Sequence, residues 1–259
     1  MRSQQNHGVL YVATGERYVR EAAESLRSLW RHHPSMPVTV YIDEPSRDVA
    51  RGWQVQDAPR KDLLEIVEHP SPTYSWADKP TALSDRGSGE RILFLDTDTR
   101  ICGTVTELFE ILDAFDLAAA HAPVRVGRQP SALANRAPAA FPELNTGVIA
   151  YRRTATIRRF LDRWRELHAE VLRSAPVALG DQATFRVALY ESDVRFTVLP
   201  PEYNCRFTFP TYLHGPVRIL HGRGADLEEV ERAVNGARGA RVFVPGVGVL
   251  PSSPPGARI

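Results

Sequence analysis

Short apolar runs and longer amphipathic segments alternate along the chain. Apolar runs typical of buried strands occur at residues 9–13, 38–42, 91–95, 117–121, 147–151, 195–199 and 217–220. Segments whose apolar residues recur at helical spacing lie at 16–33, 61–68, 77–85, 105–112, 154–173, 181–190 and 226–234, before a tail broken by Gly and Pro. This alternation predicts an α/β fold with a Rossmann-like, mainly parallel central sheet flanked by helices, whose ligands bind at the carboxyl ends of the strands.

One apolar run, at 91–95, leads directly into two carboxylates, Asp96 and Asp98. Successive side chains of a strand point to opposite faces, so these two project to the same side and converge on one point. Paired carboxylates suit Mg²⁺ or Mn²⁺, which prefer hard oxygen ligands and bridge to substrate phosphates. A turn with a helix-capping role is the alternative interpretation, because Asp is also favoured in such positions.

Length and composition exclude several classes of protein. A chain of 259 residues that is 43% hydrophobic can bury one large core, which favours a single domain over 1–259, with a core at about 9–223 and a C-terminal helix and tail at 224–259. The net charge of +1 gives no reason to expect nucleic acid or an anionic membrane as partner. No signal peptide, membrane span or disulfide pattern is evident, so we expect a cytoplasmic protein. Only two of the 32 basic residues are lysine, an arginine bias consistent with a GC-rich, bacterial genome.

Further polar residues stand near the ends of predicted elements. Lys79 lies near the start of a helix, where it could meet a diphosphate or a sugar hydroxyl, and Asn145 precedes a strand, where it could bind hydroxyl groups or stabilise a turn. Asp181 opens a helix, a position that suits capping as well as catalysis. After the strand at 217–220, a neutral His221 could be a third metal ligand, with Arg223 free to meet phosphate.

Three segments have less definite roles. Residues 122–144 are rich in Pro and Ala and form either a loop that covers the substrate or a disordered excursion, and Arg125, Arg128 and Arg136 within it are either solvated or in contact with phosphate or acceptor. The aromatic residues of segment 200–209 could stack on a flat acceptor, although core packing explains such residues more often. The arginines of the helix at 154–173 have acidic neighbours, which favours a solvated, ion-paired face over a membrane-binding one.

The order of these features resembles that of the GT-A glycosyltransferases, and within them the glycogenin-like and bacterial lipopolysaccharide galactosyltransferase-like (family 8-like) group. The resemblance covers about 9–223 and rests on the following segments: Tyr11-Val12-Ala13-Thr14, Lys79, Asp96-Thr97-Asp98, Asn145-Thr146-Gly147-Val148, Asp181-Gln182 and His221-Gly222. The chain departs from the family pattern after His221, because the later Lys-Pro-Trp is missing and Arg223 is the natural substitute for that lysine.

The resemblance implies a GT-A nucleotide-diphospho-sugar transferase fold and a role for each matching residue. Asp98 and His221 would hold Mn²⁺ or Mg²⁺ on the diphosphate of a nucleotide sugar, and Asp96 would contact the ribose or a metal-bound water. The other positions would bind the donor: Val12, Ala13 and Thr14 at the base, Arg223 at the diphosphate, Lys79, Asn145 and Asp181 at the sugar, and Gln182 near the anomeric carbon. The family implies a UDP-sugar, a hexosyl group and retention of configuration, whereas an inverting enzyme would need Asp181 or Glu143 as general base.

The acceptor and two other classes of function remain open at this stage. A sugar, a lipid-linked sugar, a natural product or a peptide could each accept the transferred group. A haloacid dehalogenase-type phosphatase also carries Asp-x-Asp after a strand, but Arg100 stands where that pattern has Thr or Val, and the motif lies far from the N-terminus. A non-catalytic nucleotide-sugar binding protein on the same fold is the other alternative, although it would be free to lose its metal ligands. A nucleotidyltransferase that makes sugar nucleotides would need a Gly-rich phosphate-binding loop near the N-terminus, and the sequence shows no such motif there.

Overall fold

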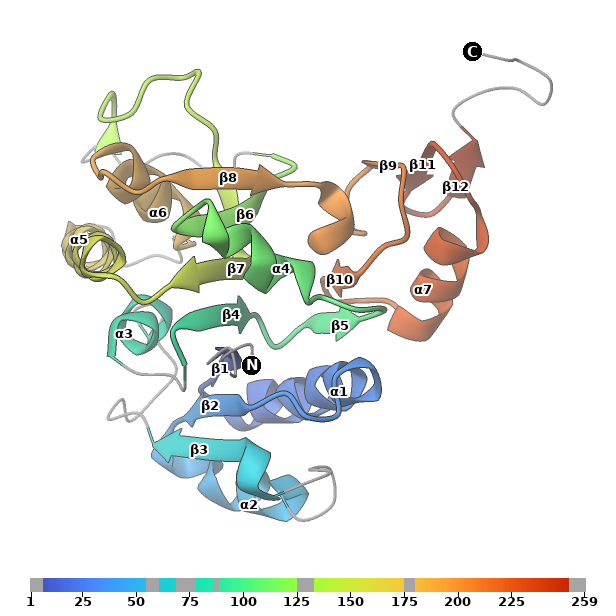
Figure 1. Ribbon diagram of the computed structural model, residues 1–259, viewed down its shortest axis with the longest axis horizontal. Coiled ribbons are helices and arrows are strands. Elements are labelled where there is room, and N and C mark those ends of the chain that lie inside the picture. The colour runs from blue at the N-terminus through green and yellow to red at the C-terminus, as the bar shows by residue number, and fades with distance from the viewer. Residues whose placement is uncertain are drawn as a thin grey trace.

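The protein is described by a computed structural model that covers residues 7–54, 61–68, 78–85, 89–124, 133–174 and 180–251. A seven-stranded sheet lies at its centre, in the order β3-β2-β1-β4-β7-β6-β8, and Figure 1 shows the strands stacked from β8 at the top to β3 at the bottom. These strands are β1 (His7–Ala13), β2 (Val38–Ile42), β3 (Leu64–Glu68), β4 (Arg91–Leu95), β6 (Leu117–His121), β7 (Leu144–Arg152) and β8 (Phe196–Leu199). All are parallel except β7, which runs antiparallel to both of its neighbours, so the sheet is mainly parallel as predicted.

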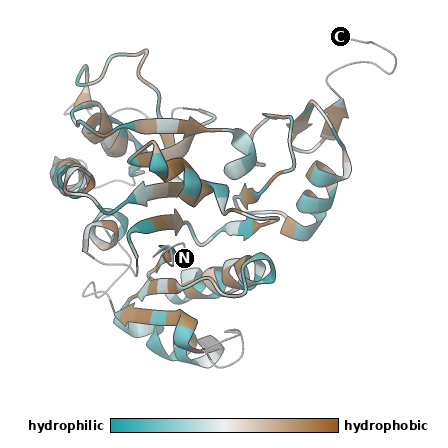
Figure 2. Cartoon of the chain, in the orientation of Figure 1, coloured by the Kyte–Doolittle hydropathy of each residue, from teal (hydrophilic) through white to brown (hydrophobic). Residues whose placement is uncertain are grey.

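Helices cover both faces of this sheet. The helices are α1 (Glu16–His32), α2 (Arg47–Gln54), α3 (Asp78–Asp85), α4 (Glu107–Glu110), α5 (Ala155–Ser174), α6 (Gln182–Tyr190) and α7 (Leu227–Gly236). Alternate residues of each strand enter separate cores: Val9 and Leu93 pack with α1, α2 and α4, whereas Leu10 and Phe94 pack with α3, α5 and α6. Brown accordingly predominates along the central strands in Figure 2, whereas α1 and α7 carry much more teal. Burial on both faces explains why the strands read as continuous apolar runs.

The prediction of a helix at 61–68 is wrong. A short 3-10 helix at Lys61–Leu63 leads into the strand β3, which pairs in parallel with β2 and forms one edge of the sheet. The β-branched Ile66 and Val67 favour a strand, and the pairing with β2 outweighs the helical spacing of so short a segment. The predicted helix at 105–112 is also shorter than expected, because α4 ends at Glu110 and a 3-10 turn follows at Ile111–Asp113.

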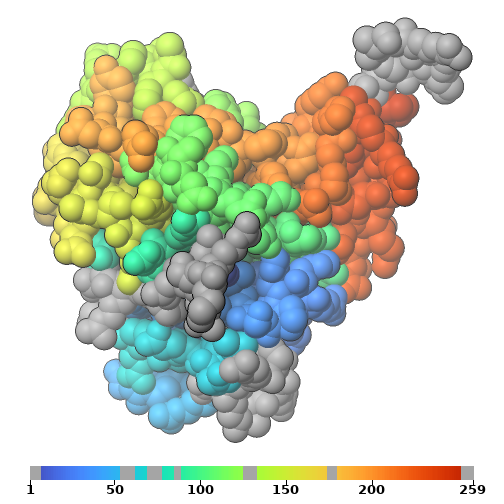
Figure 3. All heavy atoms as spheres, in the orientation of Figure 1, coloured from blue at the N-terminus to red at the C-terminus, as the bar shows by residue number. Residues whose placement is uncertain are grey.

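The C-terminal part contains strands where a tail was expected. Beyond the predicted helix α7, β11 (Arg241–Val244) and β12 (Gly248–Pro251) form a small antiparallel sheet with β9 (Thr211–Leu213). A separate pair joins β10 (Ile219–His221) to β5 (Thr99–Ile101), directly after the Asp-x-Asp segment. In Figure 3 the orange and red atoms of the C-terminal elements form a projection beside the blue atoms of α1. The β5–β10 pair is therefore what brings His221 to the carboxylates.

Across the parts of the chain that are described, every helix is too short or too polar to cross a bilayer.

Candidate functional site

The reversed strand β7 creates the candidate site. Because β7 runs against β4, its first residues lie beside the carboxyl end of β4, and Leu95 pairs with Val148. The backbone N–H of Asp96 donates to the carbonyl of Gly147 at 2.7 Å. The Asn-x-Gly segment and the Asp-x-Asp segment, far apart in the sequence, thus meet at one edge of the sheet.

The two carboxylates converge, but not for the reason the sequence suggested. The strand ends at Leu95, and Thr97 and Asp98 lie in a turn before β5. The hydroxyl of Thr99 donates to the carbonyl of Asp96 at 2.8 Å, and the N–H of Gly222 donates to the carbonyl of Asp98 at 3.0 Å. These two hydrogen bonds fix the backbone of the turn. The backbone is thus a turn, as the alternative interpretation held, while both side chains reach one point.

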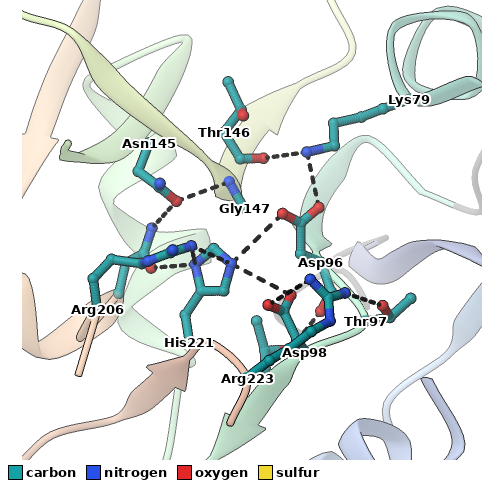
Figure 4. Close-up of polar contacts among 12 residues, drawn as sticks. Lys79, Asp96, Thr97, Asp98, Asn145, Thr146, Gly147, Arg206, His221 and Arg223 are labelled. Atoms are coloured by element: carbon teal, nitrogen blue, oxygen red, sulfur yellow. Dashed lines mark hydrogen bonds and ion pairs between the residues drawn. The ribbon is translucent and has the colours of Figure 1, made fainter. Parts of the chain in front are cut away.

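His221 completes a group of three side chains that fits a divalent cation. One ligand atom from each of Asp96, Asp98 and His221 lies within 4.8 Å of the other two (Figure 4). His221 Nε2 is 3.4 Å from Asp98 Oδ1 and 3.6 Å from Asp96 Oδ2. These distances leave the three ligand atoms close enough to share one ion. Two carboxylates and an imidazole are donors that suit Mn²⁺ or Mg²⁺.

A chain of amides determines which nitrogen of His221 carries the proton. The N–H of Gly147 donates to Asn145 Oδ1 at 3.0 Å, and Asn204 Nδ2 donates to the same oxygen at 2.9 Å. Asn204 Oδ1 therefore faces His221 Nδ1, 2.8 Å away, and must accept a hydrogen bond from an Nδ1–H group. Nε2 is left with a lone pair directed toward the two carboxylates, which is the form of imidazole that binds a metal.

Removing this support is expected to weaken the binding of the cation. Asn204→Ala leaves Nδ1 without its acceptor, and the loss of such an outer partner of a metal ligand lowers metal affinity by about 10- to 100-fold. Titration with Mn²⁺ measures the change. Asn235→Ala is the control, since Asn235 binds only the backbone of Val217 outside this site and should leave Mn²⁺ affinity unchanged. Equal Mn²⁺ affinity in Asn204→Ala and wild type would show that the amide chain does not position His221.

Lys79 joins the two acidic groups of the site. Its Nζ lies 2.8 Å from Asp96 Oδ1 and 3.1 Å from Asp181 Oδ2, and it donates to the carbonyl of Thr146 at 3.3 Å. Burial alone would lower the pKa of Lys79, but Asp181 and Asp96 raise it well above its usual range. Burial would likewise raise the pKa of Asp96, yet Lys79 and His221 hold it far below normal. Lys79 is therefore protonated and Asp96 ionised at neutral pH.

Asp181 and Gln182, at the start of α6, contact the Asn-x-Gly segment. Asp181 stands at the cap position of α6, but its side chain makes no cap hydrogen bond and instead accepts one from the hydroxyl of Thr146 at 2.9 Å. Gln182 Oε1 accepts from Asn145 Nδ2 at 2.7 Å, and Gln182 Nε2 donates to buried Glu143 at 3.4 Å. Asn145 thus links Gln182 to the amide chain behind His221.

The end of β1 also lines the cavity that these residues share. Val12 and Thr14 line it, whereas the side chain of Ala13 is buried in the core under α1, so Ala13 can contribute only its backbone. The hydroxyl of Thr14 donates to Asp78 Oδ2 at 2.8 Å. Asp78, which is almost fully buried, was not identified from the sequence.

Arg223 is less available than its position in the sequence suggests. Its Nη2 lies 2.7 Å from Glu21 Oε2 on α1, and its Nη1 lies 3.1 Å from Asp98 Oδ2. The guanidinium also lies over the ring of Tyr18, 5.4 Å from its centroid. Although burial raises the pKa of Glu21, Arg223 and neighbouring donors keep it below its usual value, so this pair stays charged.

The remaining predictions concern arginines outside the cavity and the aromatic segment at 200–209. Arg136 binds Glu191 at 2.7 Å as a surface ion pair, and Arg125 and Arg128 lie outside the described residues. The arginines of α5 also pair with acidic neighbours, as the solvated interpretation predicted. Phe207 is buried in the C-terminal core, which supports packing as the role of the aromatic segment. That segment nevertheless supplies Asn204 and Arg206, which no spacing signal had marked.

One cavity of about 300 Å³ unites these residues. Its lining includes the following side chains: Val12, Thr14, Tyr18, Asp78, Lys79, Asp96, Asp98, Asn145, Asp181, Gln182, Arg206, His221 and Arg223. Every motif taken from the sequence therefore reaches the same cavity. Its size suits a small molecule rather than a macromolecule.

Comparison with known proteins relates this architecture to glycosyltransferases. No protein-family model matches the sequence, and neither does any curated protein. Among solved structures, the glycosyltransferase GlyE of Streptococcus pneumoniae TIGR4 is 18% identical with a TM-score of 0.56, over 85% of this chain and 56% of GlyE. The galactosyltransferase LgtC, in complex with donor and acceptor sugar analogues, is 15% identical with a TM-score of 0.57, over 84% of this chain and 87% of LgtC.

A third match points to the same fold. The bifunctional glycosyltransferase WbbM is 13% identical with a TM-score of 0.56, over 87% of this chain and 47% of WbbM. The chain thus spans about half the length of GlyE and WbbM, and most of LgtC. These likenesses, together with the mainly parallel sheet and its reversed strand, show that the chain has the GT-A glycosyltransferase fold.

Proposed function

We propose that this protein is a metal-dependent glycosyltransferase that moves a sugar, namely a hexose, from a nucleotide-diphosphate donor to an acceptor. The observation that carries the proposal is the convergence of Asp96, Asp98 and His221 on one point inside the cavity of a GT-A fold. A nucleotide sugar presents a diphosphate, which binds a divalent cation through its oxygens. UDP is the nucleotide that the family resemblance favours.

Each part of the cavity suits one part of such a donor. Val12 and Thr14 would lie against the base and ribose, and Asp96, Asp98 and His221 would hold Mn²⁺ or Mg²⁺ at the diphosphate. The cation, when bound, stabilises the negative charge that develops on the departing diphosphate. Lys79, Asn145, Asp181 and Gln182 form the wall beyond the cation and would hydrogen-bond and orient the sugar.

The contacts of Asp181 support retention of configuration. An inverting enzyme needs a carboxylate that is free to accept a proton from the acceptor, and both oxygens of Asp181 are already engaged, one by Lys79 and the other by the hydroxyl of Thr146. Glu143, the other candidate base, is buried and within hydrogen-bonding distance of Gln182. We therefore expect the product to keep the anomeric configuration of the donor. NMR of the product measures this, and an inverted linkage would contradict it.

Protection against thermal unfolding tests the proposed function. A panel of nucleotide sugars is added with and without Mn²⁺, because a ligand that binds the folded state raises the melting temperature by mass action. We expect protection by one group of donors, and only when the metal is present. Protection that ignores Mn²⁺, or no protection by any donor, would contradict a metal-dependent transferase.

Neither alternative class gains support. The solved structures named above are glycosyltransferases, and no observation on the described residues favours a phosphatase. A binding protein without activity would have no need for the amide chain that holds His221 in its metal-binding form. The acceptor is a sugar, a lipid-linked sugar or a natural product in this proposal, and LgtC has been crystallised with an acceptor sugar analogue.

A further inference from the structure

Three cations line the cavity, and two of them are already neutralised by the protein. Lys79 is held between Asp96 and Asp181, and Arg223 between Asp98 and Glu21. A ligand phosphate that approached either cation would have to compete with two carboxylates. Neither is therefore the best candidate to bind an anion, although Arg223 was the expected one.

Arg206 is the third cation, and it is differently placed. Among the described residues, no carboxylate forms an ion pair with it, and its Nε is buried without a hydrogen-bond partner. Its polar contacts are with the imidazole of His221, where Nη1 lies 3.0 Å from Nε2 and 3.4 Å from Nδ1. Figure 4 shows Arg206 on one side of His221 and the guanidinium of Arg223 on the other side, next to Asp98. Within the described part of the chain, Arg206 thus carries a positive charge in the cavity that no acidic side chain pairs with.

The contact with His221 places this charge beside the candidate metal group. Nη1 of Arg206 is close to both ring nitrogens of His221, and Nε2 of the same ring is 3.4 Å from Asp98 Oδ1. A guanidinium only donates hydrogen bonds, so the natural partner for its unused donors is an anion. An anion held at the Asp96–Asp98–His221 group would have the guanidinium of Arg206 beside it.

We infer that Arg206 binds the diphosphate of the donor, beside the group of residues that would hold the metal and across His221 from Arg223. The inference rests on the proposed function and adds the residue that recognises the leaving group. Arginine suits this role, since its planar fork can give two parallel hydrogen bonds to phosphate oxygens. Such a contact favours a nucleoside diphosphate over a monophosphate.

The experiment compares wild type, Arg206→Met and Arg206→Lys by two titrations. UDP, GDP, ADP and dTDP, each with its monophosphate, are titrated in the presence of Mn²⁺, and Mn²⁺ alone is titrated by electron paramagnetic resonance. For Arg206→Met we expect a dissociation constant about 10-fold higher for the diphosphate, little change for its monophosphate, and partial recovery in Arg206→Lys. Without nucleotide, Arg206→Met should bind Mn²⁺ no more weakly than wild type, because the three candidate ligands are retained and a positive charge beside them is removed.

The two titrations separate the possible outcomes. Weaker binding of both Mn²⁺ and diphosphate in Arg206→Met would mean a distorted site and would overturn the inference. An unchanged preference for diphosphate over monophosphate would overturn it too, while leaving the proposed function intact. If the wild type binds no diphosphate with Mn²⁺, the proposed function itself fails. Arg218→Met is the control, since Arg218 faces Glu107 at 3.9 Å outside the cavity and its replacement should leave the dissociation constants of every nucleotide and of Mn²⁺ unchanged.

Discussion

Asp98→Asn is expected to remove metal-dependent nucleotide binding and to lower any transfer rate by about 10²- to 10³-fold. Asparagine keeps the size of the side chain but removes its charge, so the cation loses one of two anionic ligands beside His221. The amide would also face the guanidinium of Arg223, which now pairs with Asp98 at 3.1 Å. Thermal unfolding with and without Mn²⁺, in the presence of the nucleotide sugar that protects the wild type, measures the loss of binding.

Asp116→Asn is the matched control for this variant. Both aspartates are 8% exposed and each pairs with an arginine, but Asp116 binds Arg195 away from the cavity. Its replacement should lower the melting temperature of the free protein while the additional protection by Mn²⁺ and nucleotide remains. Wild-type protection in Asp98→Asn would show that the Asp96–Asp98–His221 group is not the metal site.

Much of the fold could be predicted because burial on both faces of the sheet leaves a simple signal. Strands β1, β2 and β4 are almost wholly apolar, and the helices α1 and α5 show clear helical spacing. The direction of β7 could not be predicted, since apolar spacing is the same for a parallel and an antiparallel strand. The strands β5, β9, β11 and β12 are too short for their spacing to separate them from loops, and they are held by pairing with each other and with β10.

The candidate site, like the fold, has a part that could be predicted from the sequence and a part that could not. Asp96, Asp98 and His221 were predicted from motif order, and the structure brings their ligand atoms together. Asn204 and Arg206 could not be predicted, because their importance comes from where the segment after β8 returns to the sheet. Asn204 meets Asn145 across 59 positions of sequence, and no local pattern records such a contact. Motifs therefore indicated the chemistry of the site, whereas the residues that orient and balance it required the fold.

Gly147 presents a second variant with a large expected effect. A Cβ atom at this position would lie 2.7 Å from both ring nitrogens of His221 and closer still to Cε1. Real Cβ atoms essentially never come this close to another heavy atom. The imidazole cannot easily move, since Asn204 holds Nδ1 on one side and β10 carries the backbone. Gly147→Ala should therefore displace His221, abolish metal-dependent protection, and destabilise the fold by about 1–3 kcal/mol through overpacking.

Gly52→Ala separates this effect from that of adding a methyl group elsewhere. Gly52 lies in α2, where a Cβ would meet nothing within 4 Å, so alanine there should raise stability by about 0.5–1 kcal/mol through its better helix propensity and leave Mn²⁺ binding unchanged. Chemical denaturation and Mn²⁺ titration of both variants give the two readouts. If Gly147→Ala binds Mn²⁺ like the wild type, the imidazole of His221 is not a ligand, because a side chain forced out of this position could not keep Nε2 facing the two carboxylates. In that case Gly147 would have only a packing role. If Gly147→Ala instead folds but loses Mn²⁺ binding, the absence of a side chain at Gly147 is what leaves room for the imidazole of His221 in its metal-binding position.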